Sequence, residues 1–269
     1  TVYSGVASLR SLRIVWFLAE LNGLHVMGGD VGNAYLEAYT KEKVCFRAGP
    51  EFRAQEGHIM MVDKALYGLR TSGACFHAKS ADTLRELGFK PSYADPDVWI
   101  RDADDCYEYI VVYVDDILTA LKEPEDLYGK LTSDPWNYKL KNVEELKYHL
   151  GRDFFRNKDG TLCYGAQTYI KRLMDNYKMM YEELPKEYHA PMDKDYKPEL
   201  DETTLLGPQG IQQFQSLIGA LQWTITLCRF DVCHAVMSLG RFRGAPREGH
   251  LEALKRLFGY MRKRSGGAI

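Results

Sequence analysis

The chain has 269 residues, with 35 Lys and Arg residues against 37 Asp and Glu residues and a formal net charge of −2 at pH 7. This length allows a sizeable core, in one large domain or in two to three subdomains. The balanced charge excludes a uniformly basic polyanion-binding protein, and no apolar run approaches the roughly 18 residues of a membrane span, so we expect a soluble, intracellular protein.

The first predicted helix covers residues 8–21, where apolar residues recur at helical spacing. An extended segment then runs from Leu24 to Asp30, and Tyr35 lies in the turn that follows. An aspartate after a strand is more often a helix cap or a turn former than a metal ligand. Two consecutive glycines precede Asp30, and such a pair predicts a pliable strand.

Short strands and a loop are predicted for residues 41–63. The string Lys64-Ala-Leu-Tyr-Gly-Leu-Arg70 follows, in which Gly68 allows close approach of the backbone to another molecule. A helix is then predicted over residues 74–87, with apolar residues on one face. Taken alone, the string fits a glycine turn that precedes a helix.

Residues 107–120 read Tyr-Glu-Tyr-Ile-Val-Val-Tyr-Val-Asp-Asp-Ile-Leu-Thr-Ala. Their β-branched and aromatic residues predict a hairpin whose tight turn carries Asp115 and Asp116. A solvated turn of this kind usually contains Asp-Gly or Asn-Gly. Two adjacent carboxylates raise each other's pKa unless a cation or hydrogen bonds intervene. The pair is therefore either a Mg²⁺ site or a surface turn with two solvated acids.

The second half of the chain is predicted to be mainly helical and to carry its charges in blocks. Residues 182–202 contain eight acids against three lysines, and residues 240–269 contain eight basic residues against two acids. The last predicted helix therefore has an apolar core face and a cationic face that suits a nucleic-acid backbone. The predicted elements are helices at 124–133, from 167 onward, at 214–223, at 229–236 and at 250–263, a hairpin turning at 158–160, and a linker at 185–208.

Three strings occur in the order found in reverse transcriptases of copia-type LTR retrotransposons. Asp30-Val-Gly-Asn-Ala-Tyr35 is similar to motif A, an Asp followed by four variable residues and an aromatic. Lys64 to Arg70 resembles the family's Lys-[Ser/Ala]-Leu-Tyr-Gly-Leu-[Lys/Arg] string at the place of motif B. Tyr113-Val-Asp-Asp116 matches the Tyr-x-Asp-Asp signature. Residues 144–151 are also similar to the family's Gly-Glu-Leu-Lys-Tyr-Phe-Leu-Gly segment, so the resemblance spans nearly the whole chain.

This resemblance implies a mixed α/β (α+β) fold, with a right-hand polymerase palm, an antiparallel sheet, partial fingers and a helical thumb or connection. Residues 1–165 would form the partial fingers and the palm, and residues 166–269 the helical thumb or connection, truncated before a ribonuclease H domain. The expected landmarks are motif A near 30–36, motif B near 64–76, the hairpin at 107–120 and the primer grip near 146–155.

The same resemblance implies an RNA-dependent and DNA-dependent DNA polymerase that uses two Mg²⁺ ions, or Mn²⁺, to transfer a dNTP to the 3′-hydroxyl of a primer on an RNA or DNA template. The implied catalytic and metal-binding residues are Asp30, Asp115 and Asp116. Tyr35 would exclude a 2′-hydroxyl by collision. The other implied residues are Val31, Tyr67 and Gly68 for the nucleotide, Tyr113, Leu150 and Gly151 for the primer, and Arg256, Arg262 and Lys263 for the nucleic-acid backbone.

Two functions of other classes remain open at this point. One is a catalytically inactive retroelement remnant that binds nucleic acid or a protein partner. The other is a metal-dependent phosphatase or nuclease, which explains the acids but not the string from Lys64 to Arg70. The resemblance further implies other Pol or capsid components as partners and no association with a membrane. It implies a location in a cytoplasmic virus-like particle and leaves nuclear entry open. It does not define an oligomeric state.

Overall fold

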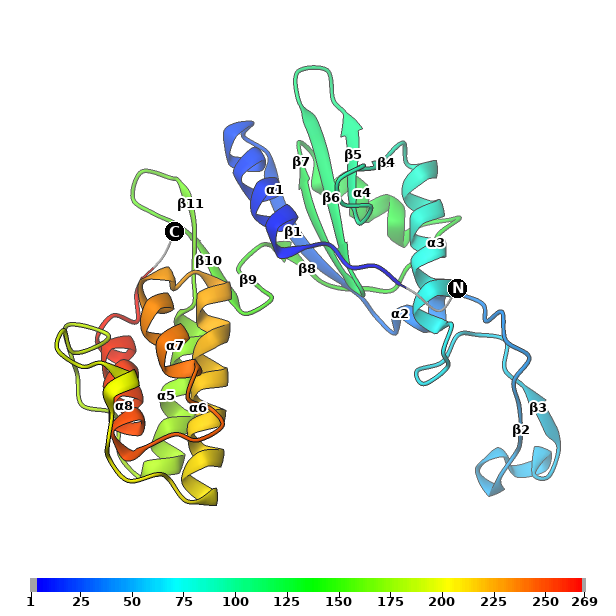
Figure 1. Cartoon of the computed structure of the whole chain (residues 1–269). Helices are drawn as coiled ribbons and strands as arrows, with labels where there is room; N and C mark the ends of the chain where they lie inside the picture. Colours follow the sequence, from blue (N-terminus) through cyan, green and yellow to red (C-terminus); the bar gives the residue numbers. More distant parts are fainter. Residues whose placement is uncertain (1–3, 268–269) are drawn as a thin grey trace. The chain divides into compact units, whose positions relative to one another are not determined.

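The computed structural model describes residues 4–267 and divides into two compact units, Thr1–Leu146 and Lys147–Ile269 (Figure 1). The helices of the first unit are α1 (Leu9–Leu21), α2 (Ala34–Glu37), α3 (Ser72–Glu86), α4 (Pro124–Thr132) and the 3-10 helix Pro50–Gln55. Its strands are β1 (His25–Val31), β2 (Cys45–Arg47), β3 (Ile59–Met61), β4 (Lys90–Pro91), β5 (Val98–Asp102), β6 (Tyr107–Tyr113), β7 (Asp116–Leu121) and β8 (Leu140–Glu145).

A six-stranded antiparallel sheet with the order β4-β5-β6-β7-β1-β8 organises the first unit. Successive side chains of a strand point to opposite faces, and both faces of β6 and β7 are buried. On one face, Ile110 and Ile117 share a core with Phe76 of α3 and Leu127 of α4. The residues of α1 lie outside that core, while α1 contacts β1 and β7, so α1 covers the other face. The predicted mixed α/β fold with an antiparallel sheet is confirmed.

Most of the elements predicted for this unit occur where the sequence indicates them. The predicted helices at 8–21, 74–87 and 124–133 correspond to α1, α3 and α4. Residues 41–63 contain β2 and β3, which pair as a hairpin and project from the rest of the unit (Figure 1). β8 was not predicted from the sequence, because most of its residues are exposed and polar.

A partly buried ion pair connects α3 to the start of β5. Nε2 of His77 lies 2.5 Å from Oδ1 of Asp97, and Asp97 is only 4% exposed. The hydrogen bond to Asp97 raises the pKa of His77, although burial opposes this shift. Because protonated His77 pairs with Asp97, protonation of His77 stabilises the folded state.

The pH dependence of stability should reveal this pair. Because the pKa of His77 is higher in the folded chain, its contribution is complete below the unfolded value of about 6.5 and is lost as the pH rises through the higher folded value. As the pH rises from about 5.5 to about 8.5, the free energy of unfolding in urea should fall more for the wild-type chain than for the His77→Gln variant. The exposed His25→Gln variant is the control and should follow the wild type. Equal losses in the wild type and in His77→Gln would contradict this assignment.

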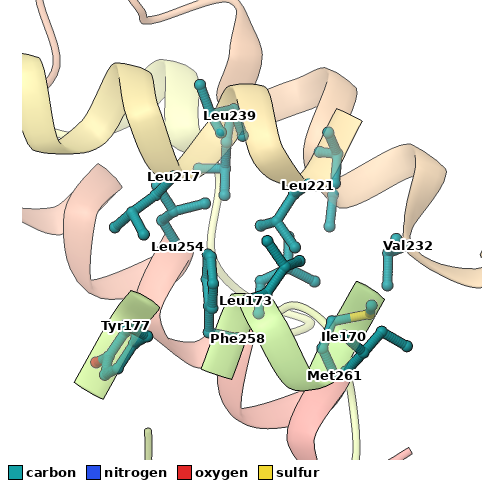
Figure 2. Close-up of a cluster of buried hydrophobic side chains, with 14 of the residues drawn as sticks. Ile170, Leu173, Tyr177, Leu217, Leu221, Val232, Leu239, Leu254, Phe258 and Met261 are labelled. Carbon is teal, nitrogen blue, oxygen red and sulfur yellow. The ribbon is translucent and has the colours of Figure 1, made fainter. Parts of the chain in front are cut away.

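The second unit consists of a small sheet and a helical bundle. Its strands are β9 (Tyr148–His149), β10 (Arg152–Arg156) and β11 (Leu162–Gly165), in the order β11-β10-β9. Its helices are α5 (Gln167–Tyr181), α6 (Pro208–Leu227), α7 (Cys233–Gly240) and α8 (Glu248–Lys263), with 3-10 segments at Pro198–Leu200 and Phe230–Val232. Figure 2 shows the apolar core that these helices share, with Leu173, Leu221, Leu254 and Phe258 among its members.

The first compact unit ends at Leu146, while the division into palm and thumb after residue 165 stays a prediction. β10 contacts α5 and belongs to the three-stranded sheet, not to the six-stranded one. Within residues 4–267, no helix combines the length and the apolar composition needed to cross a bilayer.

The acidic segment, residues 182–202, packs along α8. Nε2 of His250 lies 2.9 Å from the carbonyl oxygen of Pro198, while its Nδ1 lies 3.0 Å from the amide nitrogen of Arg247. A neutral His250 therefore donates to the segment and accepts from the start of the helix. Further along, a Cβ atom at Gly259 would overlap the carbonyl oxygen of Lys186, so the two backbones meet there.

Candidate active site

A row of polar side chains crosses four strands of the six-stranded sheet. Tyr113 of β6 pairs with Asp116 of β7, Asp116 with Asp30 of β1, and Asp30 with Lys141 of β8. Residues directly opposite each other on neighbouring strands lie on the same face with Cβ atoms about 4.5–5.5 Å apart. The fold therefore brings together two carboxylates that are 86 residues apart in the sequence, counted from Asp30 to Asp116.

The turn between β6 and β7 holds the third carboxylate. Val114 has a φ of 60°, a left-handed conformation that a β-branched residue rarely adopts. This strain costs about 1–3 kcal/mol and is typical of functional sites. Asp115 follows as an exposed residue, and its carbonyl oxygen accepts a hydrogen bond of 2.8 Å from the amide of Val31. The predicted hairpin is confirmed, with Asp115 in its turn and Asp116 at the start of β7.

Asp30 and Asp116 interact directly. Burial raises the pKa of Asp116 to about 7, and the hydrogen bond to Asp30 and the charges of Asp30 and Asp115 act in the same direction. The Asp116 carboxyl is therefore partly protonated at neutral pH in the metal-free chain. A divalent cation held near these carboxylates would favour their ionised forms instead.

Gly29, immediately before Asp30, is held firmly and does not form the pliable strand that the sequence suggested. β1 is paired on both sides, by β7 and by β8. A Cβ atom at Gly29 would lie 3.0 Å from Cε1 of Tyr128 and 3.2 Å from Cγ2 of Val143. The glycine therefore allows α4 to pack against the strand, and the hydroxyl of Tyr128 donates 3.2 Å to the carbonyl oxygen of Ile117.

Asn142 is a neighbour of Asp30 that sequence reasoning missed. Its Nδ2 lies 2.6 Å from Oδ2 of Asp30. The pairing of β1 with β8 changes register between Gly28 and Asp30, which brings the Asn142 side chain to the carboxylate. Nothing in the local sequence marks this contact, because it depends on the pairing of a strand that was not predicted.

The chemistry of these residues suits a hard divalent cation. Mg²⁺ prefers carboxylate oxygens, usually from one or two protein carboxylates together with waters and substrate phosphates. Asp30 and Asp116, with Asp115 directly before Asp116 in the chain, offer such donors. Among residues 4–267, however, no three His, Cys, Asp or Glu side chains are grouped as a metal site on their own. The structure brings two of the three predicted carboxylates together, and Asp115 remains solvent-exposed beside them.

Two of the residues predicted to bind the nucleotide, Tyr35 and Tyr67, are in contact with each other. The rings of Tyr35 and Tyr67 have centroids 4.5 Å apart, and Tyr35 also lies 6.4 Å from Phe76. Gly68 has a φ of 100°, which only glycine adopts readily. The fold thus connects the two strings that hold Tyr35 and Tyr67. Val31, the fourth predicted residue, is buried, and its amide donates to the carbonyl oxygen of Asp115.

The remaining predicted residues belong to the second unit. Leu150 and Gly151 have φ angles of 47° and 86° and form the turn between β9 and β10. The three basic residues of α8 that were predicted to contact nucleic acid already have partners in the acidic segment. These contacts are Arg256 with Asp193 at 3.4 Å, Arg262 with Glu187 at 3.6 Å and Lys263 with Glu187 at 3.9 Å.

Comparison with known proteins identifies the family. A family model described as reverse transcriptase (RNA-dependent DNA polymerase) matches residues 1–188, which include the whole polar row and its turn. The chain belongs to the reverse transcriptase family. The family predicted from the three sequence motifs is thereby confirmed.

Curated relatives of this reverse transcriptase chain come from plant and yeast transposons. The Retrovirus-related Pol polyprotein from transposon RE1 of Arabidopsis thaliana is 29% identical over 262 residues, which cover 96% of this chain and 17% of that polyprotein. The corresponding polyprotein from transposon TNT 1-94 of Nicotiana tabacum is 25% identical over 276 residues, or 100% of this chain and 21% of the relative. A putative transposon Ty5-1 protein of Saccharomyces cerevisiae is 26% identical over 235 residues, which cover 86% of this chain and 74% of that protein. The chain thus spans about a fifth of the Pol polyproteins that it matches.

Proposed function

We propose that this chain is the RNA-directed DNA polymerase part of a copia-type retrotransposon Pol polyprotein. The proposed reaction transfers a nucleotide from a dNTP to the 3′-hydroxyl of a primer on an RNA or DNA template. The observation that supports it most strongly is the pairing of Asp30 with Asp116, because it joins the motif A residue to the Tyr-x-Asp-Asp turn in a chain of the reverse transcriptase family.

Each residue of the polar row has a role in this proposal. Asp30 and Asp115 hold two Mg²⁺ or Mn²⁺ ions, and Asp116 supports them from the start of β7. When bound, such ions lower the pKa of an attacking hydroxyl and neutralise charge on the triphosphate. Tyr113 orients the hairpin and the primer end.

The nucleotide would lie beside Tyr35, Tyr67 and Gly68, with Val31 as the fourth proposed residue of its site. Tyr35 would collide with a 2′-hydroxyl, so the product would be DNA. Leu150 and Gly151 are proposed to position the primer. Arg256, Arg262 and Lys263 are proposed to contact the nucleic-acid backbone, for which they must exchange their partners in the acidic segment.

Incorporation of a single nucleotide type tests this function. On a poly(rA) template with an oligo(dT) primer and Mg²⁺, the chain should add dTTP but should use UTP about 10²-fold less well or worse. A chelator should stop the reaction. Equal use of dTTP and UTP, or incorporation that persists in the chelator, would contradict the proposal.

The proposal extends to the setting of the reaction. We propose primed RNA or DNA as the partner, other Pol or capsid components as neighbours, and a cytoplasmic virus-like particle as the location. An inactive remnant that only binds nucleic acid is the outcome expected if the chain binds the primed template and adds no nucleotide.

A further inference from the structure

We propose that Asn142 is a positioning residue that holds the Asp30 carboxylate in the orientation needed to bind a divalent cation. This inference rests on the proposed function, because it assigns Asp30 to a metal site. It adds a residue from β8, a strand outside the three motifs that identify the family.

The contact between the two side chains is specific in its chemistry. An ionised carboxylate only accepts hydrogen bonds, so the Asn142 group that faces Oδ2 of Asp30 at 2.6 Å is the NH₂ donor. A hydrogen bond to a charged acceptor is shorter and stronger than one between neutral groups. The bond restricts rotation of the carboxylate while leaving lone pairs on both oxygens for a cation.

The backbone of β8 is shaped to deliver this amide. Asn142 has a φ of 52°, a left-handed conformation that asparagine tolerates better than most residues. The residue lies in the bulge where two residues of β8, Asn142 and Val143, face the single residue Gly29. A regular strand would present Asn142 on the opposite face from Asp30.

The bulge also determines which group approaches the carboxylate. Lys141 is the direct cross-strand partner of Asp30, yet its side chain runs over Gly32, where a Cβ atom would lie 3.0 Å from Cε of the lysine. Asp30 therefore receives a neutral amide at its Oδ2. An ammonium in that place would form an ion pair and compete with a metal ion, whereas the amide orients the carboxylate without neutralising it.

The test compares two asparagines at different places in the fold that share a left-handed backbone and a side-chain hydrogen bond to an aspartate. Asn137 also has a left-handed φ, of 51°, and its Nδ2 also donates to an aspartate, Asp134, at 2.5 Å. It lies in the loop after α4, away from the polar row. Glycine keeps the left-handed backbone free of strain, so Asn142→Gly and Asn137→Gly each remove one amide without forcing the chain into another conformation.

Binding of Mn²⁺ alone, followed by electron paramagnetic resonance, is the primary readout. Asn142→Gly should weaken the affinity of the full chain for Mn²⁺ about tenfold, while Asn137→Gly should change it less than about twofold. In primer extension, Asn142→Gly should lower kcat by a similar factor with little change in the KM for dTTP. Melting curves and circular dichroism establish that each variant is folded.

The wild-type chain supplies a check that needs no variant. On titration with Mg²⁺, the side-chain NH₂ resonances of Asn142 should shift in ¹⁵N-resolved spectra, and those of Asn137 should not. This measurement retains its meaning if Asn142→Gly fails to fold.

The outcomes separate this inference from the proposed function. Normal Mn²⁺ binding and unshifted NH₂ resonances for Asn142, in a chain that extends primers, would overturn the role of Asn142 and leave the polymerase intact. Weakened Mn²⁺ binding in Asn142→Gly, in a chain that never extends primers, would support the role and overturn the polymerase. A wild-type chain that binds no Mn²⁺ would overturn both.

Discussion

Replacement of Asp116 by asparagine is expected to abolish most DNA synthesis while stabilising the metal-free chain. The variant loses a carboxylate that supports the metal ions, and removal of one preorganised charge-stabilising group typically lowers kcat about 10²- to 10³-fold. It also removes a carboxylate whose burial, together with the nearby charges of Asp30 and Asp115, raises the pKa of Asp116 to about 7. Discounted for solvent screening, this gain in stability is about 1 kcal/mol at neutral pH.

Primer extension and thermal melting in a chelator measure the two effects. Asp115→Asn is the matched control for stability: Asp115 is exposed, so its replacement should leave the melting temperature of the metal-free chain nearly unchanged. A lower melting temperature for Asp116→Asn would show that the carboxyl group stabilises this corner of the sheet and does not strain it.

Replacement of Gly259 by alanine should strongly destabilise the second unit. A Cβ atom at this position would overlap the carbonyl oxygen of Lys186 and press on the ring of Tyr188. Because the first of these is backbone, relief requires displacement of the acidic segment from α8, and overpacking of this kind costs about 2–3 kcal/mol. Urea unfolding monitored by circular dichroism measures the loss.

Gly219 of α6 provides the control for this substitution. It also lies inside a helix, but nothing stands within 4 Å of a Cβ atom placed on it. Gly219→Ala should therefore stabilise the chain by about 0.5–1 kcal/mol through helix propensity alone. Equal effects of the two substitutions would mean that the acidic segment does not pack on α8 as described.

Local sequence patterns predicted the elements of this chain well, for clear physical reasons. The apolar spacing in residues 8–21 and the β-branched runs on either side of Asp115 reflect burial, which acts on each segment separately. The meeting of Asp30 and Asp116 was predicted only through the resemblance to reverse transcriptases. Composition and periodicity place each of them at the end of a strand but do not say which strands pair.

The parts that sequence reasoning missed depend on contacts between distant segments. β8 has no apolar alternation, so neither its pairing with β1 nor the approach of Asn142 to Asp30 had a local signal. The cationic face of α8 was visible in the sequence, as was the acidity of residues 182–202. The ion pairs that join them, through Glu187 and Asp193, were not visible in the sequence, because a block of charge does not specify which oppositely charged segment it contacts.

The central claim is that the corner formed by Asp30, Asp115 and Asp116 carries out metal-dependent DNA synthesis. The most direct test is extension of oligo(dT) on poly(rA) with dTTP and Mg²⁺ by the wild-type chain and by Asp115→Asn. We predict extension by the wild type and its loss in the variant, with the fold and the binding of the primed template unchanged. Equal extension by both proteins, or none by a folded wild-type chain that binds the template, would contradict the claim.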